Sequence, residues 1–296
     1  MLHIQKYDTS PLNRVFDILL YAGLALICVS IIYPFLHLLA LSFNQGMDAI
    51  RGGIGIWPRA FTTENYTLIF ADQSLLTAAG MTVLRTVVGT VTEVLFTAGV
   101  AYCFTKKLAG YKLYMALYLL PMYWTAGVVP TYLVYRQLGI LDNFLIYILP
   151  NLAFGYNIII MRTNFRAIPA ALEESAEIDG ASTLRIFFQI ILPLSIPVLA
   201  TIGLFVAVFQ WNSWFDTMIY TQSKNLETLS SLLAKMLMEQ QSSYVGSAIV
   251  GKRANHLTPE VLRAAMTMVT TVPILLIYPF VQRFLVTGLV VGSVKE

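Results

Sequence analysis

Residues 18–43 read ILLYAGLALICVSIIYPFLHLLALSF, an apolar run that contains no Asp, Glu, Lys or Arg. About 20 apolar residues are enough for an α-helix to cross a bilayer. The run is too long for the apolar core of a signal peptide and no small-residue cleavage site follows it, so we expect it to remain as a spanning helix. Five further segments are also long enough to cross a bilayer: Leu75–Phe104, Leu113–Tyr135, Asn143–Met161, Ile190–Phe215 and Leu262–Leu285. The sequence therefore predicts an all-α, polytopic membrane protein with six transmembrane helices.

The composition of the chain agrees with this prediction. Hydrophobic residues make up 57% of the 296 residues, charged residues make up 12%, and the mean hydropathy is +0.69. Soluble domains carry about 25% charged residues, and a soluble domain so poor in charge would expose large apolar patches. The net charge of +3 is not gathered into a Lys/Arg tract, so nucleic acid is not an expected partner.

The distribution of basic residues predicts the orientation. An even number of spans places both termini on one side of the membrane. The short connection 105–112 contains lysines and no acid, whereas the connection 136–142 has one base and one acid. Lys and Arg in short loops mark the cytoplasmic side. We therefore expect the connection 105–112 and both termini to be cytoplasmic.

A polar stretch, residues 162–189, separates the fourth and fifth predicted spans on the expected cytoplasmic side. Pro169 suits the start of a helix, and Asp179-Gly180 suits its end. Ser182 or Thr183 can then cap a second helix that runs to Pro193. The pattern predicts two short helices joined at a glycine, a shape suited to docking a soluble partner.

Within this stretch, EESAEIDGASTLRIFFQIILPLSIP (residues 173–197) contains a spaced motif. Glu174-Ser175-Ala176 is followed at fixed intervals by Gly180 and by the run Ile190 to Pro193. The motif resembles the Glu-Ala-Ala signature of the inner-membrane permeases of binding-protein-dependent ABC importers, and it departs from that signature only at Ser175. The chain also resembles the carbohydrate-uptake (MalG-like) permeases. It is most similar to their branch for complex oligosaccharides and polysaccharide fragments (the LplC/YtcP type). The stretches that carry this similarity are YPFLHLLALSFN, PTYLVYRQLGILDN and WNSWFDTMIY.

The resemblance implies the type I ABC importer (MetI-like) permease fold in a bacterial cytoplasmic (inner) membrane. It implies residues 1–74 as an N-terminal tail, first helix and external loop, and residues 75–296 as a core permease domain with a cytoplasmic coupling loop, 162–189. The partners implied are a second permease subunit, usually a different chain, a cytoplasmic ATPase dimer that binds ATP and Mg, and an extracytoplasmic solute-binding protein that delivers an oligosaccharide. This chain itself would be neither an enzyme nor a cofactor-binding protein.

Two groups of candidate site residues follow from these patterns. An acidic helix face in the coupling loop could simply be solvated, but the matched spacing favours docking of the ATPase. Small residues there would allow close approach, and acids could pair with bases of the ATPase. The ATPase-coupling candidates are Glu173, Glu174, Ala176, Asp179 and Gly180.

The second group concerns the substrate pathway. Amides can bind sugar hydroxyls, and indole rings can stack on the C–H face of a pyranose, although aromatic residues near a span end also form ordinary interfacial belts. Both interpretations stay open for Gln210, Trp211, Asn212 and Trp214, and weaker candidates from the fourth span are Asn151, Tyr156 and Asn157.

Glu93 is an acid well inside a predicted span, and such residues are candidates for function. Arg85 lies on roughly the same helix face, and pairing of Glu93 with a neighbour is favoured over a proton relay. An ion-coupled secondary transporter is the alternative function, although no paired broken helices in inverted repeats are visible. The histidines show no zinc-site spacing, so no metal is expected.

Overall fold

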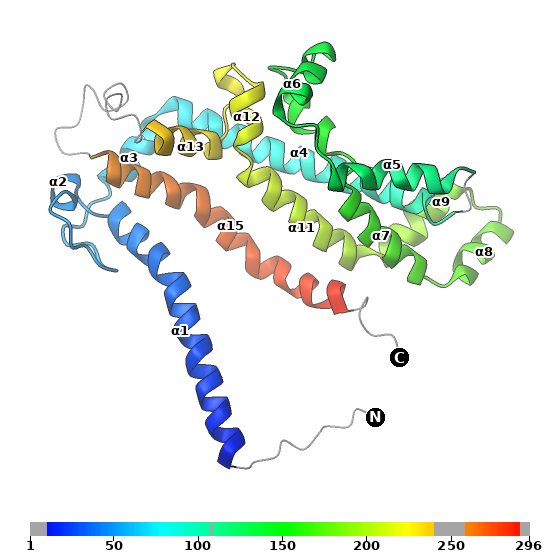
Figure 1. Cartoon of the computed structure of the whole chain (residues 1–296), viewed down its shortest axis with the longest axis horizontal. Helices are drawn as coiled ribbons and strands as arrows, with labels where there is room; N and C mark the ends of the chain where they lie inside the picture. Colours follow the sequence, from blue (N-terminus) through cyan, green and yellow to red (C-terminus); the bar gives the residue numbers. More distant parts are fainter. Residues whose placement is uncertain (1–10, 107–108, 240–257, 291–296) are drawn as a thin grey trace. The chain divides into compact units, whose positions relative to one another are not determined.

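The computed structural model describes residues 11–106, 109–239 and 258–290, and these residues form helices joined by short connections (Figure 1). The helices before the coupling loop are α1 (Pro11–Ser42), α2 (Gly46–Ala49), α3 (Glu64–Ala71), α4 (Gln73–Cys103), α5 (Tyr111–Tyr123), α6 (Val128–Gln137), η1 (Phe144–Tyr147), η2 (Leu149–Asn151) and α7 (Gly155–Ala167). Those that follow are α8 (Ala170–Ile178), α9 (Thr183–Ile186), the π-helical η3 (Phe187–Ile191), α10 (Leu192–Leu194), α11 (Ile196–Asn212), α12 (Phe215–Tyr220), η4 (Lys224–Leu226), α13 (Leu229–Glu239) and α15 (Pro259–Val290).

The chain divides into two compact units. The first comprises Met1–Ala71 with Glu239–Val269, and the second comprises Asp72–Met238 with Thr270–Glu296. In the first unit, almost every side chain of α1 between residues 13 and 36 is exposed, as expected for a helix that needs lipid or another membrane helix around it. The end of α1 packs through Ala40 and Leu41 against Ile54 and Val261.

The second unit is built around α4, which packs along α11 and α7 (Figure 1). Its buried side chains recur at helical spacing and include Ala78, Arg85, Glu93 and Ala101, so Arg85 and Glu93 share the inward face as predicted. A Cβ on Gly89 would lie only 2.8 Å from the side-chain nitrogen of Gln210 on α11. Glycine is therefore required at this position for the two helices to approach so closely.

Three described helical segments are long and apolar enough to cross a membrane alone: Asn13–Ser42, Gln73–Cys103 and Pro259–Pro279. Two bent pairs meet the same criterion together and raise the number to five. Phe144–Asn151 with Gly155–Ala167 is bent by 53°, and Thr183–Leu194 with Ile196–Asn212 is bent by 82°. Both pairs overlap the fourth and fifth spans predicted from the sequence.

The predicted third span, Leu113–Tyr135, is wrong as a single helix. The helix α5 ends at Tyr123, and α6 begins at Val128 after a break in which Gly127 has φ +84°. Pro121 removes a backbone donor from the last turn of α5, while Pro130 falls in the first turn of α6, where a missing N–H costs nothing. The prolines thus separate two helices instead of kinking one.

The fifth predicted span starts later than expected. Residues Ile190–Leu194 continue the second helix of the coupling loop, and the membrane helix α11 begins after the bend at Ser195. Pro197 lies in the first turn of α11, where a proline favours the start of a new helix. An apolar sequence alone does not reveal this change of direction.

Candidate functional site

The coupling loop has the predicted form of two short helices joined at a glycine. Pro169 is the N-cap of α8, and Gly180 follows the helix with φ +80°, a left-handed conformation that glycine adopts without steric cost. The hydroxyl of Ser182 then accepts a hydrogen bond from the backbone N–H of Arg185 at 3.4 Å and caps α9. The prediction of this local structure is confirmed.

Two of the five ATPase-coupling candidates face this chain's own core. Glu173 forms an ion pair with Lys106, just beyond the end of α4, and its carboxylate is 3.5 Å from the hydroxyl of Tyr102. Burial by itself would lower the pKa of Lys106, but the hydrogen bonds to Glu173 and Tyr102 outweigh it and raise this pKa above its ordinary value. Ala176 packs against the apolar core of the unit. These two residues therefore attach α8 to the rest of the second unit.

The other three candidates, Glu174, Asp179 and Gly180, are exposed. The same loop also exposes two apolar residues that the sequence analysis did not single out. Ile178 is 87% exposed and Leu184 is 70% exposed. Both lie in the polar stretch between two spans, and that position was the available signal that they are exposed outside the apolar segments.

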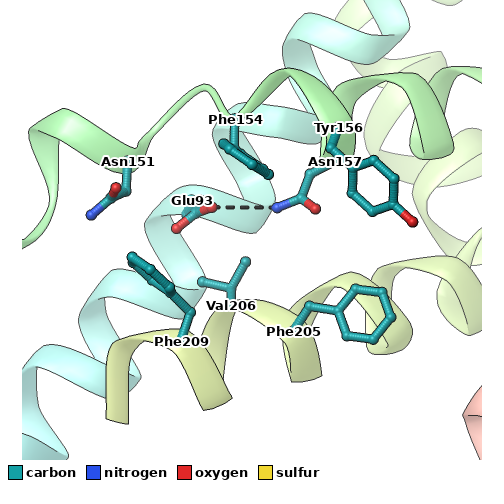
Figure 2. Close-up of a pocket in the computed structure, with 8 residues that line it drawn as sticks. All are labelled: Glu93, Asn151, Phe154, Tyr156, Asn157, Phe205, Val206 and Phe209. Atoms are coloured by element: carbon teal, nitrogen blue, oxygen red, sulfur yellow. Dashed lines mark hydrogen bonds between the residues drawn. The ribbon is translucent and has the colours of Figure 1, made fainter. Parts of the chain in front are cut away.

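A cavity of about 400 Å³ lies between α4, the η2–α7 segment and α11 (Figure 2). Three of the predicted substrate-pathway residues, all from the weaker group, line it: Asn151, Tyr156 and Asn157. The remaining lining residues were not predicted, and they are Glu93, Phe154, Phe205, Val206 and Phe209. Amides, a carboxyl group and aromatic rings around one cavity have the chemistry to bind the hydroxyls and C–H faces of a sugar.

Glu93 is the acid among the residues that line this cavity, and 5% of its surface is exposed. Its Oε1 accepts a long hydrogen bond of 3.4 Å from the side-chain amide of Asn157, as Figure 2 shows. Its Oε2 is buried and has no hydrogen-bond partner within the described part of the chain. The expected pairing of Glu93 with a neighbour is therefore made through one carboxyl oxygen only.

The stronger group of predicted pathway residues does not line the cavity. Gln210 is fully buried, its carbonyl oxygen accepts from the guanidinium of Arg85, and its amide donates to the carbonyl of Tyr147 at 3.0 Å. The indole of Trp211 donates to the backbone carbonyl of Thr270 at 2.9 Å. Both polar groups are thus satisfied within the protein, which is the usual state of buried polar groups.

The last two residues of that group lie at the end of α11. The amide of Asn212 donates to the carbonyl of Val208 within its own helix at 2.9 Å. Trp214 is 37% exposed and packs edge to face on Phe215. This arrangement agrees with the interfacial-belt interpretation that the sequence had left open.

Arg85 is paired with Asp216 of α12 and not with Glu93. The closest nitrogen–oxygen distance in this ion pair is 2.6 Å, and the guanidinium also lies 4.1 Å from the centre of the Tyr147 ring. Arg85 therefore ties α4 to the segments around α11 and α12. Glu93 takes part in none of the ion pairs of the described residues.

Comparison with known proteins gives consistent matches over most of the chain. Residues 95–290 match the family described as binding-protein-dependent transport system inner membrane component. The chain is 34% identical to the polygalacturonan/rhamnogalacturonan transport system permease protein YtcP of Bacillus subtilis (strain 168), over 96% of this chain and 99% of YtcP. It is also 34% identical to Protein LplC of the same organism, over 100% of both chains.

A solved structure is similar as well. It is a bacterial ABC transporter involved in the import of the acidic polysaccharide alginate, with a TM-score of 0.84 and 29% sequence identity over 93% of this chain and 98% of that chain. These likenesses confirm the resemblance and the fold that the spaced motif in residues 173–197 predicted.

Proposed function

Because the chain belongs to the family of binding-protein-dependent transport system inner membrane components, we propose that it imports oligosaccharides or polysaccharide fragments as one permease subunit of an ATP-driven transporter. A second permease subunit would complete the pathway, and a solute-binding protein would deliver the sugar from outside. A cytoplasmic ATPase dimer would bind ATP and Mg, which leaves this chain without a catalytic residue or cofactor of its own.

The observation that carries the proposal is the exposed face of the coupling loop. Ile178 and Leu184 offer apolar area for a partner surface, and the exposed acids Glu174 and Asp179 lie in the same loop. Apolar anchors within a polar rim are typical of protein interfaces. The ion pair of Glu173 with Lys106 would then transmit movement of the docked ATPase to α4 as a rigid-body shift.

The orientation and domain roles form part of the same proposal. Residues 162–189 and both termini would lie on the cytoplasmic side of a bacterial inner membrane. Residues 1–74 would supply the tail, the first spanning helix and an external loop, and residues 75–296 would form the core permease domain. The cavity beside Glu93, together with Asn151, Tyr156 and Asn157, would lie on the substrate pathway.

Gly180 offers a test of the docking role. A valine at φ +80° would suffer backbone strain of about 1–3 kcal/mol. An added Cβ would meet no atom of this chain within 4 Å. Gly180→Val should therefore insert normally into the membrane but lose sugar uptake and ATPase recruitment, whereas Gly180→Asn should retain more of both because Asn tolerates the left-handed conformation.

The measurement is oligosaccharide uptake in cells, together with a blot for both subunits in the purified complex. Near wild-type uptake by Gly180→Val at normal expression would remove the docking role. A second candidate function, an ion-coupled secondary transporter, is favoured only by the buried acid Glu93. Uptake that persists without the ATPase and follows an ion gradient would support that alternative.

A further inference from the structure

We infer that the segment 43–62 after α1, the return segment, folds back to the bilayer, where Ile56 and Trp57 insert into the phospholipid headgroup layer. The observation behind this inference is a pair of strongly exposed apolar side chains held beside one end of a membrane helix. Trp57 is 81% exposed and Ile56 is 54% exposed. The lipid-binding surface that they form goes beyond the proposed function, because neither residue belongs to the substrate pathway or to the coupling loop.

The position of α1 in the bilayer follows from its charges and its exposure. Asp17 is the last charged residue before a run that contains none until Asp48. About 20 residues separate Asp17 from His37, and an α-helix needs about 20 to cross the hydrocarbon core. Exposure changes at the same place, because every residue of the range 18–36 is exposed whereas His37 and Leu38 are partly buried. His37 therefore marks the second edge of the hydrocarbon core.

A hydrogen bond holds the return segment at this level. The imidazole Nδ1 of His37 lies 3.1 Å from the carbonyl oxygen of Gly55, which accepts the hydrogen bond. Helical side chains point toward the helix N-terminus, so this contact lies no farther from the bilayer centre than the Cα of His37. Trp57 follows Gly55 by two residues, which span about 7 Å at most. The headgroup layer is itself roughly 5–8 Å thick on each side, so the Cα of Trp57 lies within this layer or at its edge.

The shape of the return segment is fixed by hydrogen bonds to the end of α1. The side-chain oxygen of Asn44 accepts from the backbone N–H groups of Arg59 and Ala60, both at 2.9 Å. The backbone N–H of Gln45 donates to the carbonyl of Ala60, also at 2.9 Å. The guanidinium of Arg59 pairs with Asp48 at 3.4 Å. The two exposed apolar side chains are therefore presented by a folded segment whose backbone is tied to the helix.

Lipid is the occupant that these features favour. The exposed face of α1 already requires an apolar environment, and the return segment brings two more apolar side chains to the level where that face ends. Tyr33 stacks on His37 at this level, with ring centres 6.4 Å apart, and is 53% exposed. Trp and Tyr are enriched in the headgroup layer, because their rings are apolar and carry one polar group. The anchor sets the depth of α1, whose packing within its own unit involves its last turns.

The test measures membrane depth with a spin label on single cysteines, in a chain without the native cysteines. The complex of both permeases and the ATPase is placed in nanodiscs, and label collisions with oxygen, which concentrates in lipid, are compared with collisions with a water-soluble nickel chelate. Leu26→Cys, on the exposed middle of α1, is the lipid control, and Glu64→Cys, at an exposed acid, is the water control. Trp57→Cys and Ile56→Cys should give oxygen-to-nickel ratios between the two controls, at least about threefold above the water control.

A second measurement tests Trp57 itself. With the label kept at position 56, Trp57→Ser should lower the ratio toward that of the water control, whereas Trp57→Tyr, which keeps an amphipathic ring, should preserve it. Addition of the solute-binding protein should leave the ratio unchanged.

Four results would each overturn the inference: a ratio equal to that of Glu64→Cys, a label shielded by protein from both reagents, an unchanged ratio in Trp57→Ser, or a loss of oxygen access when the solute-binding protein is added. Membrane depth is measured without sugar uptake or ATPase recruitment. Failure here is therefore distinguishable from failure of the proposed function, which the Gly180 variants test.

Discussion

Arg85 provides the sharpest test of how the second unit is held together. Its guanidinium donates to both carboxylate oxygens of Asp216, at 2.6 and 3.2 Å, and to the side-chain oxygen of Gln210, at 3.0 and 3.2 Å. Arg85 is fully buried, and the side chain of Asp216 is 15% exposed. Replacement of Arg85 by Met keeps much of the apolar stem but removes every one of these donors.

The expected loss in the free energy of unfolding follows from the groups that Arg85→Met leaves unpaired. Breaking a buried ion pair by removing one partner costs about 3–5 kcal/mol, because the remaining charge is uncompensated. The orphaned oxygen of Gln210 adds a penalty of about 1–3 kcal/mol, and the partial exposure of Asp216 reduces the total since water can reach its carboxylate. We therefore expect Arg85→Met to lower the free energy of unfolding by about 3–5 kcal/mol.

The assay is denaturant unfolding of the purified permease in detergent, followed by tryptophan fluorescence. Arg136→Met is the matched control, because Arg136 is exposed and its loss should change stability by less than about 0.5 kcal/mol. The double variant Arg85→Met with Asp216→Leu should recover much of the loss, since it leaves no unpaired charge. A loss below about 1 kcal/mol in Arg85→Met, or a double variant no more stable than the single one, would refute this account.

Two further predictions concern the loops. Hydrogen bonds from the Ser223 side chain and from the backbone of residues 222 and 223 hold the pKa of Asp142 below its ordinary value of 3.8. The stability contributed by the ionised form is thus present above pH 3.8 and is lost as the pH falls through the lower folded-state pKa. Asp142→Asn should therefore melt below wild type at pH 6, and the gap should narrow as the pH falls below 3.8, whereas a gap independent of pH would contradict this. The orientation can be tested with single cysteines in a variant that lacks the native cysteines. In intact cells, Ser175→Cys should be protected from an impermeant thiol reagent, whereas Lys224→Cys should be labelled. External labelling at position 175 would show that the predicted orientation is wrong.

The coupling loop could be predicted well because its signals are local. Pro169, Gly180 and Ser182 act through the conformation and hydrogen bonds of their own neighbours, so their roles are readable without knowing the rest of the fold. The spacing of the motif in residues 173–197 also indicated the protein family, and the comparisons confirm that family. The continuous third span could not be read in this way, because a proline in an apolar run is compatible with both a kink and a break.

The candidate pathway could be predicted only in part. Gln210 has the chemistry to bind a sugar, yet its amide is used by Arg85 and Tyr147, which lie far from it in the sequence. Glu93 was expected to find a structural partner, and it receives one long hydrogen bond from Asn157, while the arginine on its own helix face is occupied by Asp216. Both outcomes arise because the availability of a polar group depends on which distant residues surround it.

Hydropathy, charge and motif spacing are properties of short segments, and they were sufficient to establish a helical membrane permease with a two-helix coupling loop. Helix directions, the inward position of Glu173 and the cavity beside Glu93 depend instead on the packing of α4 against α7 and α11. The physical reason is that burial and hydrogen-bond satisfaction are properties of contacts between segments. The same glutamate or glutamine can therefore be structural or free to bind a ligand, according to what the fold places next to it.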